Sequence, residues 1–116
     1  MNRAKEWEEE IIGRFPLIDR IGLPITAKFI TILEEMGGFD EGADLHYNLL
    51  TRDINIACPK SRCLITPEYV DKQVSSFRCV LPLWVLKIQP TSEAIQVFLR
   101  TYWPVLFPQD IEEKGE

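Results

Sequence analysis

Long apolar runs, an export signal and a surplus of basic charge are all missing from this sequence. The longest unbroken apolar run, 79–86, includes Pro82 and is far shorter than the roughly 20 residues that a membrane-spanning helix needs. The first ten residues contain no apolar core of the kind that signal peptides have, so we expect a cytoplasmic protein with reduced thiols. With 18 acidic and 13 basic residues, the composition argues against a general nucleic-acid binder.

Recognisable catalytic and ligand-binding motifs are also missing. The sequence has one histidine, His46, and no nucleophile motif such as G-x-S-x-G. The pair Gly37-Gly38 follows a predicted helix instead of preceding one, which is typical of a helix end and not of a phosphate-binding loop. The acidic residues of 40–44 do not follow the calcium-loop pattern. We therefore predict a protein that is not an enzyme and has no cofactor or metal, with a small enzyme using His46 as an alternative.

The 116 residues suffice for one domain with a single core, because 46% of them are apolar. We assign this α+β domain to 1–108 and expect 109–116 to be an acidic, frayed tail. Apolar residues at spacings of three and four predict helices over 2–15, 26–36 and 66–75 and a last helix that begins near 90. Period-two alternation and β-branched residues predict strands near 47–49, 54–58, 63–65 and 77–88.

These elements follow the order α-α-β-β-α-β-α, which predicts about four helices packed on a small, mostly antiparallel sheet. Four residues define the expected boundaries. Thr26 is the expected N-cap of the second helix, and Pro67 the first residue of the third. Pro82 predicts a bulge or an edge position within the strand 77–88. Pro104 is expected to end the last helix.

The charge is unevenly distributed along the chain. Residues 1–45 carry five basic and ten acidic side chains, whereas 46–108 carry seven basic and four acidic ones. The basic side chains of the middle segment include Arg52, Lys60, Arg62, Lys72, Arg78 and Lys87. We expect them to pair with the acidic first helix and tail. The alternative is a basic patch, with Lys60 and Arg62 in its loop, that meets an acidic partner or phosphates.

Cys58 and Cys63 face each other if 54–58 and 63–65 form a hairpin with a four-residue loop. Directly opposed residues have Cα atoms about 4.5–5.5 Å apart, which overlaps the range of disulfides. This arrangement predicts either two reduced, buried cysteines or a reversible redox pair. Adding Cys79 and His46 gives a Cys₃His set, which is a possible zinc site although only the Cys58–Cys63 spacing is typical of one.

The segment 103–108 places large apolar side chains between two prolines. Its residues Trp103, Val105, Leu106 and Phe107 either cover the core or form an exposed interaction surface. We predict a protein-interaction module, acting as a regulator, inhibitor, immunity-type or adaptor protein and self-associating through this segment as a homodimer. The alternatives are a redox- or zinc-responsive protein using Cys58 and Cys63, and a small enzyme or nucleic-acid binder using the basic middle segment.

Overall fold

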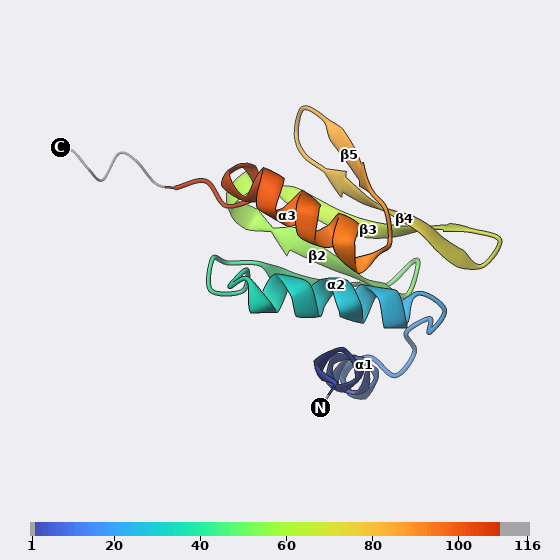
Figure 1. The fold of residues 1–116 in the computed structure, drawn as a ribbon. Helices are drawn as coiled ribbons and strands as arrows, with labels where there is room; N and C mark the ends of the chain where they lie inside the picture. Colours follow the sequence, from blue (N-terminus) through green and yellow to red (C-terminus); the bar gives the residue numbers. More distant parts are fainter. Residues whose placement is uncertain (1, 110–116) are drawn as a thin grey trace.

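Five antiparallel strands form one sheet, and the helices lie against one side of it (Figure 1). The computed structural model describes residues 2–109. The helices of this part are α1 (Arg3–Arg14), α2 (Leu23–Glu35) and α3 (Ser92–Leu106), with a 3₁₀ turn η1 (Pro59–Ser61). The strands are β1 (Asp44–Asn48), β2 (Asp53–Cys58), β3 (Cys63–Val70), β4 (Gln73–Val80) and β5 (Val85–Ile88). The predicted α+β class is confirmed, with three helices instead of four.

Each strand pairs with the next one along the chain, in the order β1-β2-β3-β4-β5. Because side chains alternate between the two faces of a strand, the register assigns each residue to one face. The face toward the helices, here the helix face, carries the buried residues Ile54, Ile56, Cys58, Cys63, Ile65, Phe77, Cys79 and Ile88. We call the opposite side the open face. The rings of Phe29 on α2 and Phe77 on β4 pack edge to face, with centroids 4.9 Å apart.

The helix predicted over 66–75 is wrong, because these residues form a β-hairpin. Asp71 and Lys72 have φ angles of 52° and 64°, as the two central residues of a type I′ turn require. Val70 therefore pairs with Gln73, and β3 and β4 run antiparallel from this turn. Pro67 is therefore not the first residue of a helix. It lies in β3 beyond the point where pairing with β2 ends, so its missing N–H costs no bond to β2.

The single strand predicted over 77–88 is also corrected. Pro82 lies in a turn that divides this stretch into the end of β4 and β5. The N–H of Leu81 donates to the carbonyl oxygen of Trp84 at 2.9 Å and closes the turn. Proline suits such a position because it fixes φ and needs no hydrogen-bond partner.

Two predicted helix boundaries move. The second helix begins at Leu23 instead of after Thr26, with Gly22 as N-cap and Pro24 in its first turn, where proline is tolerated. The last helix continues through Pro104 to Leu106. Its final residues are held by packing, because Leu106 and Phe107 are buried in the core. The tail expected over 109–116 lies, apart from Gln109, outside the described residues.

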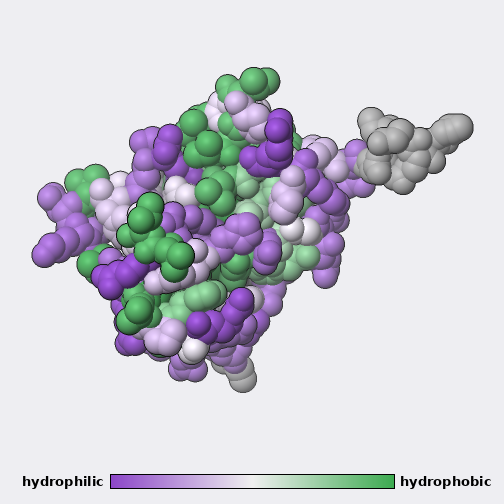
Figure 2. Space-filling view, turned by 180° about the vertical axis from the view of Figure 1, so that it is seen from behind, coloured by the Kyte–Doolittle hydropathy of each residue, from purple (hydrophilic) through white to green (hydrophobic). Residues whose placement is uncertain are grey.

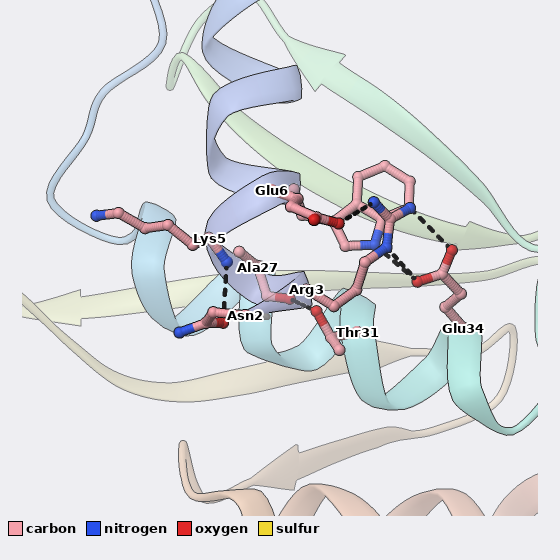
Figure 3. Close-up of polar contacts among 8 residues, drawn as sticks. Asn2, Arg3, Lys5, Glu6, Ala27, Thr31 and Glu34 are labelled. Carbon is pink, nitrogen blue, oxygen red and sulfur yellow. Dashed lines mark hydrogen bonds and ion pairs between the residues drawn. The ribbon is translucent and has the colours of Figure 1, made fainter.

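Hydrogen bonds from Arg3 and Trp7 of α1 to Glu34 of α2 connect the two helices, and we call these three residues the polar clamp (Figure 3). Arg3 donates to both carboxylate oxygens of Glu34, at 2.9 and 3.0 Å, and also to Glu6 at 3.1 Å. The indole N–H of Trp7 donates to Glu34 at 3.0 Å. The hydrogen bond from Arg3 is the main reason that the pKa of Glu34 lies below its usual value. At the start of α1, Asn2 caps the helix by accepting from the backbone N–H of Lys5.

The helix layer and the helix face enclose one core. Its fully buried side chains include Ile11 of α1, Leu33 of α2 and Leu99 of α3. At the β1 edge, the rings of Phe15 and Tyr47 stack in parallel with centroids 4.8 Å apart. None of the helices within residues 2–109 combines the length and apolar character needed to cross a bilayer.

Candidate interaction surface

The residues predicted to form a C-terminal interaction surface are largely part of the core. Leu106 and Phe107 are buried, and Trp103 and Val105 are half-buried. The rings of Trp103 and Phe107 pack on each other with centroids 4.6 Å apart. In this conformation Leu106 and Phe107 are not available to a partner, so the segment does not present its four large side chains together.

Three of the predicted basic residues, Lys60, Arg78 and Lys87, have an acidic side chain close by. Lys60 Nζ lies 3.5 Å from Glu41 Oε1, and Arg62 is exposed at the end of η1. Arg78 Nε and Lys87 Nζ lie 3.4 and 3.0 Å from the carboxylate oxygens of Glu68. The structure does not show the expected pairing of these side chains with the acidic first helix, and the acidic residues of the expected tail lie outside the described residues.

The cysteines meet on the helix face, but without the histidine. Cys58 and Cys63 are directly paired in the β2–β3 ladder, as the sequence predicts, and both are buried. Cys79 joins them from β4, with its Sγ 2.8 Å from Cys63 Sγ. His46 lies on the opposite face of the sheet, 3.6 Å from Asp44. Across residues 2–109, no group of His, Cys, Asp and Glu side chains is arranged to hold a metal ion, so the Cys₃His set does not assemble.

The open face carries a row of apolar side chains that sequence reasoning missed. Ala57 pairs with Leu64, Leu64 with Val80, and Val80 with Val85, so four neighbouring strands place an apolar residue at the same level. Leu64 and Val85 are 36% and 46% exposed. The alternation within 63–68 was the available signal, and the wrong helix over 66–75 concealed it.

The turn after this row extends the apolar surface. Leu83 is 94% exposed, whereas Trp84, which is 46% exposed, lies on the α3 side of the sheet. Figure 2, which views the molecule from behind, shows hydrophobic atoms at the top of the molecule, where Figure 1 places the β4–β5 turn, and others among polar groups below. We call the open-face residues Leu64, Val80 and Val85, together with Leu83 of the turn, the β5 surface.

A polar cluster borders the β5 surface on the same face. Glu68 lies at its centre, where it contacts Lys87 and Arg78 and accepts a hydrogen bond from Ser76 at 3.2 Å. The hydrogen bond from Lys87 is the main cause that lowers the pKa of Glu68. The cluster joins β3, β4 and β5, and it gives the apolar row a charged rim.

On its other side, β5 borders a groove against α3. The groove has a volume of about 710 Å³ and is lined by residues that include Ile88, Ala94, Val97, Phe98 and Tyr102. The ring of Trp84 meets that of Tyr102 edge to face, with centroids 6.2 Å apart. Apolar surface is therefore accessible on both sides of β5.

The backbone of β5 has unpaired hydrogen-bonding groups. Because Leu81 and Trp84 form a hydrogen-bonded pair, the alternation along an antiparallel ladder makes Val80–Val85 and Arg78–Lys87 non-hydrogen-bonded pairs. The N–H and C=O groups of Val85 and Lys87 therefore point away from β4. No strand of the described chain pairs with this side of β5.

A second apolar hollow lies at the other end of the sheet. It has a volume of about 460 Å³, and its lining includes Phe15, Leu17, Tyr47 and Leu49. Leu17 and Leu49 are exposed, as is Leu50. This hollow is formed mainly by the α1–α2 connection and the β1–β2 turn, so it lacks the strand edge and the ordered row that define the β5 surface.

Resemblance to characterised proteins adds nothing to this geometry. In comparisons with protein-family models, curated proteins and solved structures, the chain matched none of them.

Proposed function

We propose that the protein is a non-enzymatic interaction module that receives an extended strand of another protein chain along β5. The observation that carries the proposal is an edge strand with outward N–H and C=O groups at Val85 and Lys87, flanked by apolar surface on both sides. Strand addition uses main-chain hydrogen bonds for affinity and side-chain pockets for specificity.

The surroundings of β5 suit such a strand. Side chains of an added strand would alternate between the open face, beside Val85, and the groove that contains Val97 and Phe98. Trp84 directly precedes β5 and is half-exposed, and tryptophan is enriched among the residues that dominate binding energy. The edge of the sheet at β1 is less suited to an added apolar strand, because its open face carries the polar residues Asp44 and His46.

The expected self-association becomes a specific case of this proposal. Two copies of β5 can pair about a twofold axis at Leu86, so that Val85 of each copy lies opposite Lys87 of the other. This register satisfies the outward groups of both residues in each copy. It replaces the segment 103–108 as the proposed contact, because Leu106 and Phe107 are buried.

Selection of displayed random peptides on the immobilised full-length protein tests the proposal. We expect the selected peptides to alternate apolar and polar residues. Val85→Pro should weaken their binding by about tenfold or more, which corresponds to about 1.4 kcal/mol, because proline removes an outward N–H without breaking the ladder to β4. Light scattering over a wide concentration range, on the same variant, tests pairing between two copies.

The matched control is Leu50→Asp, which changes an exposed side chain at the opposite end of the sheet. Binding should be unchanged in this variant. Amide chemical shifts should report peptide contact along β5 and at 94–102 of α3. Peptides that bind Val85→Pro as well as the unmodified protein, or that shift only the hollow around Leu49, would contradict the proposal.

A further inference from the structure

Three thiols gather at one end of the helix face, and one of them contacts both others. Cys58 ends β2, Cys63 begins β3, and Cys79 lies on β4. Since β3 lies between β2 and β4, Cys63 is the central member. Cys58 is its direct partner across the ladder, and Cys79 is its diagonal neighbour, since Cys79 pairs with Ile65.

The geometry favours a bond from Cys63 to Cys79. Their Sγ atoms are 2.8 Å apart and share a hydrogen bond. A disulfide has an S–S distance of about 2.05 Å, so a side-chain movement of less than about 1 Å closes the bond. All three cysteines are buried, and the exposed turn 59–62 separates Cys58 from Cys63 in the chain. Local opening of this turn would uncover the thiols without unfolding the helix layer.

The neighbouring thiols also influence where a thiolate forms. A hydrogen bond from Cys58, and a second one from Cys79, lower the pKa of Cys63, while burial opposes them. The same hydrogen bonds, together with burial, raise the pKa of Cys58 and of Cys79. The central cysteine is therefore the thiol of this cluster that loses its proton most readily, and the thiolate is the nucleophilic form.

We propose that Cys63 and Cys79 form a peroxide-reactive site, in which Cys63 is the attacking thiol and Cys79 the resolving thiol. The thiolate sulfur of Cys63 attacks one oxygen of a hydroperoxide. The O–O bond breaks, the alkoxide leaves and takes up a proton, and Cys63 becomes a sulfenic acid. The sulfur of Cys79 then attacks Cys63 Sγ, the S–S bond forms as the S–O bond of the sulfenic acid breaks, and the hydroxyl group leaves as water with the thiol proton of Cys79. Two thiols lose two electrons, and the hydroperoxide is reduced to an alcohol and water.

Tryptic mapping distinguishes the possible bonds, because trypsin places each cysteine on a different peptide, namely 53–60, 63–72 and 79–87. The folded full-length protein is treated with one equivalent of hydrogen peroxide, alkylated in denaturant and digested. We expect a linked pair of 63–72 and 79–87 that dithiothreitol separates. A pair that contains 53–60, or complete alkylation of all three cysteines after oxidation, would overturn the proposal.

Variants separate the two roles. Cys79→Ala should stop the reaction at the sulfenic acid of Cys63, which dimedone traps on peptide 63–72. Cys58→Ala removes one hydrogen bond to Cys63 but keeps both sulfurs of the proposed bond, so the bond between Cys63 and Cys79 should still form, at a lower rate. Circular dichroism checks that each variant is folded. If Cys79→Ala does not fold, dimedone added to the unmodified protein during oxidation still reports the attacking thiol, and an adduct on 53–60 or 79–87 would contradict its assignment to Cys63.

Discussion

The helix face and the open face of the sheet are built from adjacent residues of the same strands, yet their environments differ. On β4, Phe77 and Cys79 are fully buried against the helices, whereas Arg78 and Val80 keep part of their surface exposed. The helix face contributes most of the hydrophobic stabilisation, because it is the side removed from water. On β3, β4 and β5 the open face keeps more of its side-chain surface in water, so it contributes less to this stabilisation.

The largest expected loss of stability comes from a substitution of Phe77 on the helix face. Phe77→Ala removes a fully buried ring that packs on Phe29 and leaves a cavity between α2 and the sheet. We expect a loss of about 3–5 kcal/mol in the free energy of unfolding, measured by urea denaturation. The control is Val80→Ala on the same strand, which should cost about 1 kcal/mol or less. Equal losses in the two variants would remove the distinction between the faces.

The helix layer can be weakened at its polar clamp, with a smaller effect. Glu34→Gln should cost about 1 kcal/mol near neutral pH, because it replaces a charged acceptor of Arg3 and Trp7 with a neutral one. Since the folded-state pKa of Glu34 is lowered, the carboxylate's contribution is present above its ordinary value of 4.5. This contribution is lost as the pH falls through the folded-state pKa.

Urea denaturation at neutral and at acidic pH checks this prediction. The difference in stability between Glu34→Gln and the unmodified protein should shrink as the pH falls below 4.5. Glu35→Gln, at the exposed next position of α2, serves as the control and should change stability little. A pH-independent difference for Glu34→Gln would argue against the charged clamp.

The smallest expected change in stability comes from a substitution of Val85 on the open face. Val85→Thr keeps a β-branched side chain and changes a half-exposed position, so the free energy of unfolding should change by no more than about 0.5 kcal/mol. The corresponding change on the helix face, Ile56→Thr, buries a hydroxyl and should cost more than about 2 kcal/mol. Thermal and urea denaturation of the two variants measure the contrast, and similar losses would contradict it.

The elements that sequence reasoning placed correctly depend on local spacing. The first helix follows from Trp7 and Ile11 on one face, and the β2–β3 hairpin from the alternation that ends at Cys58. The β3–β4 hairpin was missed because its short apolar runs fit a helix as well as a strand. What distinguishes them is the pairing of Leu64 with Val80, sixteen residues away.

The candidate site was less predictable than the fold. Leu106 and Phe107 are as apolar as an interface requires, and only packing shows that they are buried. Val85 and Leu64 are ordinary strand residues in the sequence, and only the register places them in one exposed row with Val80.

The sequence by itself determined the α+β class, the first helix and the opposition of Cys58 and Cys63, because each depends on residues close together in the chain. The tertiary structure alone decided that Cys79 joins these cysteines, that β5 has a free edge, and that Leu64 and Val85 stay partly exposed on one face of the sheet. These features arise from pairings and packing between distant segments, whose stabilising energy appears only when the whole chain has folded.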